Sequence, residues 1–276
     1  LRHFATMHFL TRPITALGSR AIEILEFLGG LGYLLRDAAV ASRAALFGKR
    51  GRRMGWANLW AQMDRVGVRS IPIVSLVLFC IGAILALQMA PILRDYGVVE
   101  QVADIISIAI FRELGPLVAA IVLTGFAGAS IAAELGSMVV SEEIEALDAQ
   151  AISPIRFLVF PRVFATTLMM VCVAVIGDIM GIVGGLLISK AFIGIGFTQY
   201  LQHTFDAVKL QDFITGLVKA GVFGMLISGI ACHLGLNVTG GAQGVGVATT
   251  RTVVLTIVAL IFVDLLFTSV FYFLGW

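Results

Sequence analysis

Long stretches with almost no charged side chains constrain this sequence more than any other feature. Five are present, three without charge and two with one acid each: 70–93, 114–133, 163–189 with Asp178, 220–250, and 252–276 with Asp264. A helix needs roughly 20 apolar residues to cross the hydrocarbon core of a bilayer. Each stretch is long enough, so we expect an integral membrane protein.

The composition supports the same assignment. Hydrophobic side chains make up 59% of the 276 residues and charged ones 13%, with a mean hydropathy of +1.01. These values lie outside the range of soluble globular domains. The formal net charge is only +2. This argues against a nucleic-acid partner, because such binding relies on a large basic surface.

The uncharged stretches predict an all-α fold with five transmembrane helices. We place them near residues 69–91, 106–136, 158–189, 213–236 and 250–274. The stretch 220–250 is too long for one span, and we expect its glycine-rich second half to form a turn. Residues 1–66 would form an N-terminal cytoplasmic and interfacial region, and residues 67–276 the five-span domain.

Basic residues set the predicted orientation. Eleven of the 19 Lys and Arg residues precede the first span, and such residues favour the cytoplasmic side. The N-terminus would be cytoplasmic, together with the connections 137–157 and 237–249. The connections 92–105 and 190–212 and the C-terminus would face the other side. The chain begins with Leu1 rather than Met, so we expect it to be trimmed.

An amphipathic helix is predicted before the first span. Its apolar residues recur at three- and four-residue spacing, namely Ile24, Phe27, Leu28, Leu31, Leu34, Leu35, Ala38 and Leu46. Charged residues occupy the opposite face. Because only about 65 residues precede the span, a helix in the membrane interface is favoured over a soluble subdomain. The basic cluster 49–53 would contact anionic headgroups or act as a plain topogenic signal.

Ionisable residues inside the spans form a predicted charge layer, made of Arg112, Glu113, Asp178, Lys219 and Asp264. Glu113, Asp178, Lys219 and Asp264 lie at depths of roughly 10–16 Å from the outer surface, at 1.5 Å per residue. Charged groups within spans are costly and often functional. The layer would line a cavity open to the outer side, or it would form a structural ion pair that fixes helix register. We expect Glu113 and Asp264 to neutralise Lys219, with Asp178 as the alternative partner.

A short helix is predicted in the connection between spans two and three. It would be capped by Ser141, carry Glu142 and Glu143 in its first turn and end at Ser153-Pro154. An apolar stripe follows from Ile144, Leu147 and Ala151. A helix lying on the membrane would recruit basic residues rather than acids. We therefore expect a docking surface for a cytoplasmic partner.

Motifs for catalysis, nucleotide binding or metal binding are missing from the sequence. The glycine-rich segment 239–246 has no preceding strand and no following Lys-Ser or Lys-Thr, and no Walker A sequence occurs elsewhere. The four histidines are scattered, which argues against a zinc site. We expect no catalytic residue, no metal and no cofactor on this chain.

Three blocks of sequence follow one another from Arg112 onward: Arg112-Glu113-Leu114-Gly115-Pro116, GASIAAELGSMVVSEEIEALDAQAISPIRFLVFPRV from Gly128 to Val163, and TGGAQGVGVATTRTVV from Thr239 to Val254. In these blocks the sequence resembles the MlaE (YrbE) family, the permease subunits of ABC-type lipid transporters associated with MCE-domain proteins. The family-motif positions are Gly115, Pro116, Glu134, Pro154, Pro161, Arg162, Gly240, Gly241 and Arg251. Relatives also carry charge at the positions of Arg112, Glu113, Asp212, Lys219, Arg251 and Asp264. Phe126 departs from the family, which often has Arg there, so that arginine's role does not carry over.

The resemblance implies an assembly in the bacterial inner membrane. It implies a homodimer with a lipid pocket between subunits, open to the periplasm, an ABC ATPase below and an MCE-domain protein above. In some systems a small STAS-domain protein binds the ATPase. The helix Glu142–Ala151 would then be the coupling helix on the ATPase, which alone would bind ATP and Mg²⁺.

We therefore expect a non-enzymatic permease that moves phospholipid between the inner membrane and a periplasmic carrier and maintains outer-membrane lipid asymmetry. Two alternatives come from other classes: an ion-coupled secondary transporter that uses the charge layer, and an intramembrane lipid-modifying enzyme. A secondary transporter would work without an ATPase and often shows inverted repeats, which this sequence lacks. An enzyme would convert lipid when purified alone.

Overall fold

The structure is a computed structural model that describes residues 18–19, 22–23, 25–41 and 56–275. All the regular secondary structure of the described residues is helical. After the helical residues 25–41, the helices are α2 (Trp56–Val66), α3 (Ile71–Asp95), α4 (Val102–Ala109), α5 (Gly115–Leu123), α6 (Ala129–Val140), α7 (Glu143–Ala149), α8 (Phe160–Ile188), α9 (Phe197–Ala207), α10 (Leu210–Leu236) and α11 (Gly241–Leu274).

Five apolar helical stretches are long enough to cross a membrane, which confirms the predicted number of spans. They are Asn58–Asp95, Val99–Val140, Ile155–Ile193, Leu210–Leu236 and Gly241–Leu274. Four of them are longer than the uncharged stretch that revealed them, because their helices continue into polar residues at one or both ends. Extra turns of this kind reach beyond the roughly 30 Å hydrocarbon layer. The fourth span, Leu210–Leu236, instead begins before residue 220 and ends before residue 250.

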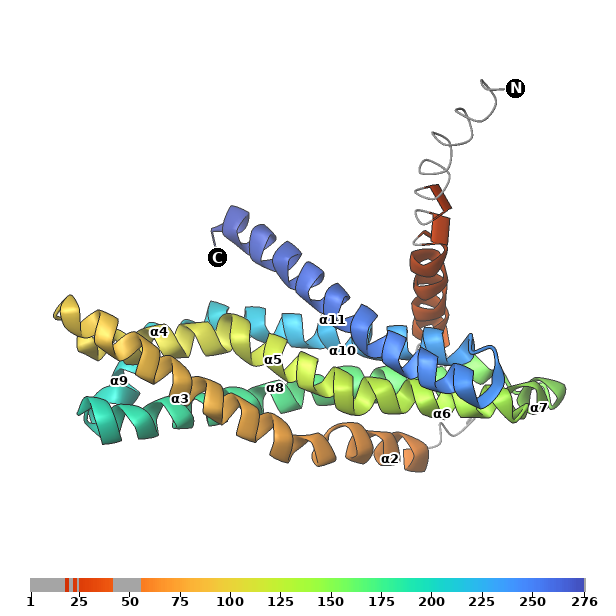
Figure 1. The fold of residues 1–276 in the computed structure, drawn as a ribbon, viewed down its shortest axis with the longest axis horizontal. Helices are drawn as coiled ribbons and strands as arrows, with labels where there is room; N and C mark the ends of the chain where they lie inside the picture. Colours follow the sequence, from red (N-terminus) through yellow and green to blue (C-terminus); the bar gives the residue numbers. More distant parts are fainter. Residues whose placement is uncertain (1–17, 20–21, 24, 42–55, 276) are drawn as a thin grey trace, which may run out of the picture.

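The spans form an elongated bundle with two distinct ends (Figure 1). The short helix α7 and the turn between α10 and α11 mark one end, which we call the α7 end. The start of α4 and the helix α9 mark the opposite α9 end. Helix α11 begins against α6 and α10, and its second half then diverges from the bundle (Figure 1).

Helix α11 meets the bundle through residues spaced four apart. Ala248, Thr252, Thr256 and Leu260 are all buried, and we call this series the α11 ladder. Side chains at this spacing lie on one face of a helix. The face continues through Asp264 and Thr268, so two polar residues follow the ladder where the helix diverges.

The long spans contain wide π-helical turns at 110–114, 124–128, 155–159 and 189–193. Two of them precede prolines, Pro116 and Pro161, each at the start of the next helix. Proline has no N–H, and its ring clashes with the carbonyl four residues earlier. A local widening of the turn accommodates the ring and keeps the span helical across the membrane.

Glycines allow α3 and α8 to approach closely. A Cβ on Gly82 would overlap the Gly181 carbonyl, and a Cβ on Gly184 would overlap the Phe79 carbonyl. Small residues have this role in membrane proteins, where helix association depends on van der Waals contact between backbones. The glycine spacing in span three thus has a packing explanation.

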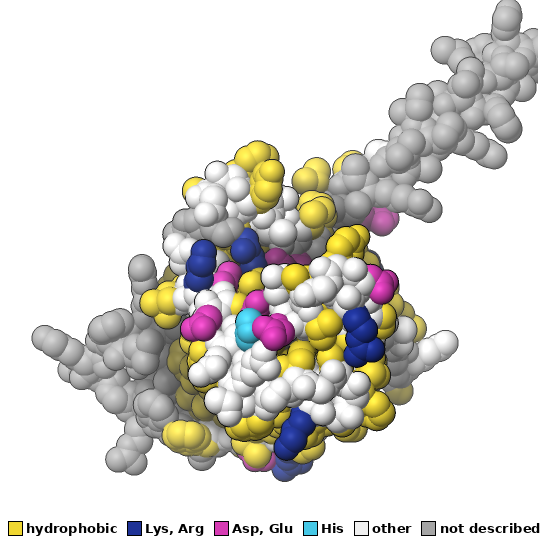
Figure 2. Space-filling view, turned by 90° about the vertical axis from the view of Figure 1, so that its left-hand side faces the viewer, with side chains coloured by type: hydrophobic (Ala, Val, Ile, Leu, Met, Phe, Trp, Pro, Cys, Tyr) yellow, Lys and Arg dark blue, Asp and Glu magenta, His cyan; other side chains and the backbone are white. Residues whose placement is uncertain are grey.

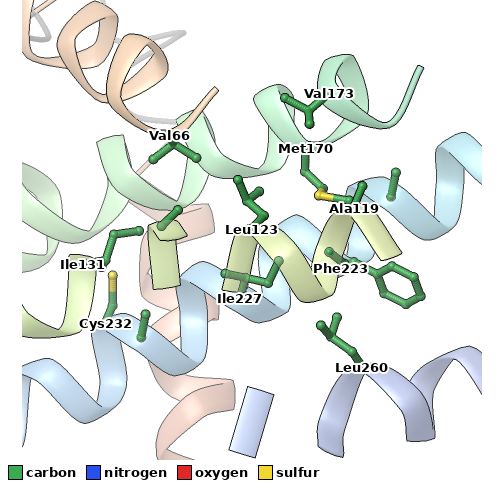
Figure 3. Packing of buried hydrophobic residues seen from close by; sticks show 14 of the residues in the cluster. Val66, Ala119, Leu123, Ile131, Met170, Val173, Phe223, Ile227, Cys232 and Leu260 are labelled. Carbon is green, nitrogen blue, oxygen red and sulfur yellow. The ribbon is translucent and has the colours of Figure 1, made fainter. Parts of the chain in front are cut away.

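An apolar core joins the spans at the middle of the bundle. Figure 3 shows Leu123, Met170, Phe223, Ile227 and Leu260 converging from α5, α8, α10 and α11. All five are fully shielded from solvent. The core fixes the relative positions of α10 and α11, which carry Lys219 and Asp264, and of α5, which directly follows the π-turn that carries Arg112 and Glu113.

The helix at residues 25–41 crosses the bundle at a steep angle near the α7 end (Figure 1). Leu31 packs against Ile230 and Leu234 of α10, and the Phe27 and His233 rings meet edge to face with centroids 5.1 Å apart. Its steep angle to the spans is the direction that a helix in the membrane interface would have, and the interfacial position stays a prediction. Ile24, Leu46 and the basic cluster 49–53 lie outside the described residues.

Two connections differ from the sequence prediction. The turn expected over 237–249 is confined to 237–240, and the glycine-rich segment from Gly241 onward is already helical. Positive φ angles at Gly240 and Gly241 accommodate the sharp reversal, so only two of the glycines are needed for it. The connection 190–212 contains helix α9, whose amphipathic pattern we had not assigned.

Candidate functional site

An ionic cluster centred on Lys219 lies between α10, α11 and the π-turn at 110–114. The Lys219 Nζ lies 2.5 Å from Glu113 Oε2 and 2.9 Å from Asp264 Oδ1. It also donates a hydrogen bond of 3.1 Å to Thr268 Oγ1, and that hydroxyl donates to Glu113 Oε1 at 3.1 Å. We call these four residues the Lys219 cluster.

Burial within the Lys219 cluster is uneven. The Lys219 side chain is fully buried, the Asp264 side chain is 15% exposed and the Glu113 side chain is 30% exposed. A buried ammonium needs opposite charge and hydrogen bonds to offset its lost hydration. The two carboxylates and the Thr268 hydroxyl supply them, and Glu113 extends the cluster to the surface.

The π-turn at 110–114 places Glu113 toward α10. A Cβ on Gly216 of α10 would overlap the Phe111 carbonyl, so the turn and α10 touch through backbone. The Phe111 and Phe213 rings meet edge to face at 5.8 Å. Gly115 and Pro116 follow the turn and are buried. The π-turn and the two family-motif residues that follow it, Gly115 and Pro116, therefore shape the geometry of the site.

Arg112 forms a second ion pair beside the Lys219 cluster. Its Nη1 lies 3.5 Å from Asp212 Oδ1, and the two side chains are 28% and 11% exposed. Asp212 also accepts a hydrogen bond from the Lys209 backbone N–H at 3.1 Å and so caps the start of α10. The adjacent residues Arg112 and Glu113 thus bind Asp212 and Lys219, which lie about two turns apart on α10.

Asp178 lies apart from the Lys219 cluster. It is buried on α8, and its Oδ1 lies against Gly115. Within the described residues it forms no ion pair with Lys219. The structure therefore brings together Glu113, Lys219 and Asp264 from the predicted layer and excludes Asp178 as the alternative partner. Asp178 was expected at the same depth in the membrane as Lys219, but its side chain does not face Lys219.

Another ionic cluster lies toward the α7 end. Glu134 of α6 accepts from Arg65 of α2 at 2.8 Å and contacts Arg162 of α8 at 3.1 Å. The Arg162 side chain is only 4% exposed, and it also donates to the Leu158 carbonyl at 2.8 Å. Two family-motif positions, Glu134 and Arg162, thus pair with each other, and this cluster joins three spans.

The helix in the 137–157 connection differs in detail from the prediction. It spans Glu143–Ala149, and Glu142 precedes it with a left-handed φ of 61°. The Ser141 cap was wrong, because the Ser141 hydroxyl donates back to the Ser137 carbonyl at 2.9 Å. The helix ends at Ala149, four residues before Ser153-Pro154. Ala151, which lies between them, has a left-handed φ of 57°.

The apolar stripe on α7 faces this chain. Ile144 and Leu147 pack against the core of the bundle, and Ala151 is exposed beyond the end of the helix. The acids and the alanines Ala146 and Ala149 are left on the exposed face. A partner at this end would therefore meet a small, acidic surface instead of the stripe.

The remaining family-motif residues lie at the α7 end. Pro154 precedes the π-turn at 155–159, and Pro161 is buried at the start of α8. Gly240 and Arg251 line a hollow of about 310 Å³ between the end of α10 and the start of α11. Arg251 is exposed there. These residues shape the turns and the surface that a partner at the α7 end would meet.

Several residues of these clusters were missed by the sequence analysis. Thr268 lies four residues after Asp264, so helical spacing placed it on the same face. Arg65 lies 69 residues before Glu134 in the chain, and no sequence pattern connects the two. Among the described residues, no group of His, Cys, Asp and Glu side chains is arranged to hold a metal ion.

The surroundings of the Lys219 cluster suit an amphiphilic ligand. Arg112 and Glu113 provide one positive and one negative group that are accessible at the edge of the bundle. The diverging half of α11, whose Thr268 binds Glu113, also exposes Ile261, Leu265 and Leu266. Charged groups next to a large apolar surface match a molecule with a polar head and hydrocarbon chains.

Comparison with known proteins identifies the family. Residues 59–270, most of the chain, match the family model described as Permease MlaE. A probable ABC transporter permease protein of Rickettsia felis is 37% identical over 93% of this chain and 96% of its own length. The intermembrane phospholipid transport system permease protein MlaE of Haemophilus influenzae is 30% identical over 94% and 97%. The chain therefore belongs to the MlaE permease family and is a non-catalytic permease subunit of an ABC transporter.

Proposed function

We propose that this chain moves phospholipid between the bacterial inner membrane and a periplasmic carrier of the MCE-domain class, and so helps maintain outer-membrane lipid asymmetry. One observation carries the proposal: the similarity to the Haemophilus influenzae phospholipid transport permease extends over nearly the full length of both chains. An ABC transporter permease works with ATPase subunits, which supply the energy from ATP.

The Lys219 cluster supports a lipid substrate over a small soluble one. Its member Glu113 contacts Thr268 on the exposed apolar half of α11, and the neighbouring Arg112 is also partly accessible. The guanidinium of Arg112 suits a phosphate oxygen. Acyl chains would cover the apolar side chains of α11. Buried Lys219 would hold Glu113 and α11 in place instead of meeting the lipid.

Two copies would form the transport unit, with the lipid pocket between them. Helix α11 exposes a continuous apolar surface that includes Val254, Val258, Ile261, Phe262 and Leu265. Such a surface suits either lipid or a second copy of the chain. The small residues that pack α3 on α8 are used within the subunit, so we assign the dimer contact to α11.

The two ends of the bundle would meet different partners. The α7 end faces the cytoplasm and would contact the ABC ATPase through α7, with ATP and Mg²⁺ bound by that subunit. A STAS-domain protein would contact only the ATPase. The α9 end faces the periplasmic carrier, and Figure 2 shows acidic side chains gathered around a histidine on it. His203 lies 3.1 Å from Asp104 there.

Reconstitution tests the proposal directly. The chain would be purified with its ATPase and MCE-domain partners and placed in liposomes that contain fluorescent phosphatidylethanolamine and phosphatidylglycerol. We expect lipid transfer to the carrier to require ATP and to stop when the ATPase is inactivated. Transfer by the chain alone under an ion gradient would establish a secondary transporter, and conversion of the lipid would establish an enzyme. Either result would overturn the proposal.

A further inference from the structure

A buried carboxyl group on α8 has no role in the ionic clusters. Asp178 is 3% exposed, and its Oδ1 is shielded from solvent without a hydrogen-bond donor in the described structure. An isolated carboxylate is very costly in an apolar interior, where the group becomes neutral instead. A buried Asp178 therefore needs another group that stabilises it.

The carboxyl group points at the end of the π-turn that carries Arg112 and Glu113. A Cβ on Gly115 would overlap Asp178 Oδ1 and would lie 2.8 Å from the Ile110 carbonyl oxygen. Both oxygens therefore lie against the same glycine. The Ile110 carbonyl accepts the Gly115 N–H, which closes the π-turn, and it has a second lone pair available.

The charged side chains of the surrounding elements are paired elsewhere. The part of α3 that packs on α8 and the whole of α5 have no charged residue. On α10, Lys219 binds Glu113 and Asp264, and Asp212 binds Arg112. On α2, Arg65 binds Glu134, and on α4, Asp104 binds His203. Each cation named here thus has an acid other than Asp178.

We propose that Asp178 is held as a neutral carboxylic acid whose O–H donates to the Ile110 carbonyl. A carboxylate oxygen and a carbonyl oxygen are both acceptors and repel each other, whereas a protonated acid supplies the missing donor. The bond would tie α8 to the π-turn. Asp178 is then a positioning residue that fixes the direction in which Arg112 and Glu113 leave the turn.

Gly115 completes the arrangement. Its lack of a side chain lets the carboxyl group reach the turn, which gives a physical reason for the glycine in the Arg-Glu-Leu-Gly-Pro block. Only the consequence for transport rests on the proposed function. The protonation state and the contact with the turn are properties of the folded chain, so they can be measured without partners.

Two measurements on the purified full chain test the inference. Infrared difference spectra between wild type and Asp178→Asn should contain the C=O stretch of a protonated carboxyl group at neutral pH. The position of the turn is measured by cross-linking cysteines at Phe111 and Phe213, after the native Cys80, Cys172 and Cys232 are replaced. An Asn side chain can still donate to the Ile110 carbonyl, whereas the Leu of Asp178→Leu cannot.

We expect Asp178→Asn to retain the wild-type cross-linking yield and Asp178→Leu to reduce it at least about twofold if the donor holds the turn. Asp264→Asn serves as the matched control, because it weakens the Lys219 cluster and should leave the protonated carboxyl band in place. Carboxylate bands in the wild-type minus Asp178→Asn spectrum would overturn the inference. So would equal loss of cross-linking in both Asp178 variants. If the Leu variant fails to fold, the spectrum and the Asn variant still decide.

Discussion

The Lys219 ammonium lies 2.9 Å from the Asp264 carboxylate, one helical turn beyond the last member of the α11 ladder, Leu260. Apolar contact holds α11 up to Leu260, and charge holds it from there to Thr268.

The first prediction concerns the loss of the Lys219 charge. In Lys219→Met the carboxylates of Glu113 and Asp264 lose their counter-ion, which typically costs about 3–5 kcal/mol when one partner of a buried pair is removed.

The measurement is growth of a deletion strain under outer-membrane stress, with protein abundance followed by immunoblot. Lys209→Met is the control, because Lys209 is exposed near the start of α10. Low abundance of Lys219→Met indicates a structural role, and normal abundance without growth indicates a role in transport. Wild-type growth and abundance would show that the cluster is incidental.

A second prediction concerns the cluster at the α7 end. Glu134→Gln leaves Arg162 buried without its counter-ion, so we expect a loss of stability of a few kcal/mol, about 3 in the typical case. Thermal unfolding in detergent measures it. Glu145→Gln on the exposed face of α7 is the same chemical change without burial and should leave the melting temperature unchanged. Equal melting temperatures for the two variants would refute the predicted role.

The close approach of α3 and α8 gives a third prediction. Gly184→Ala places a methyl group on the Phe79 carbonyl. A backbone carbonyl cannot yield as a flexible side chain can, so α3 and α8 must move apart and the protein should lose stability. Gly246→Ala has no atom within 4 Å of the new methyl group and should be neutral or gain up to about 1 kcal/mol of helix propensity. Thermal stability of the two purified variants decides, and a stable Gly184→Ala protein would contradict the packing.

The fourth prediction locates the ATPase contact on the exposed face of α7. Ala149→Arg adds a bulky cation to that face without touching the core, so we expect loss of the co-purifying ATPase from a folded membrane protein. Ala191→Arg makes the same change near the α9 end, where Ala191 is also exposed, and should retain the ATPase. Leu147→Asp is a poorer test, because Leu147 packs against this chain's own core.

The fifth prediction is the number of copies. Native mass spectrometry of the detergent-solubilised complex should show two of these chains. Val258→Arg on the exposed face of α11 should release single chains, since a charge opposes close contact of two apolar helices. An assembly with one copy in the wild type would remove the pocket that we propose between subunits.

The sequence alone predicted the spans and much of the Lys219 cluster, for a simple physical reason. Charge is so costly in a membrane that its position along the chain marks both span ends and depth. Glu113, Lys219 and Asp264 were therefore found from depth. Depth carries no information on rotation about the helix axis, so Asp178 was grouped with residues that it does not contact.

Other features needed the folded chain. The ion pair of Arg65 with Glu134 joins residues far apart in sequence, and the π-turns change the helical period that pattern analysis assumes. The stripe of Ile144 and Leu147 has the same spacing whether it faces a partner or the chain's own core. Only packing distinguishes those cases.

The α11 ladder also limits which insertions and deletions this chain can tolerate. Each residue inserted or deleted between Leu260 and Asp264 turns the rest of the helix by about 100°. Asp264 and Thr268 would then leave Lys219 without any substitution at the cluster itself. Substitutions on the outward face of α11 should be tolerated more readily than such insertions or deletions. The number of residues in this segment is thus as much a part of the site as their identity.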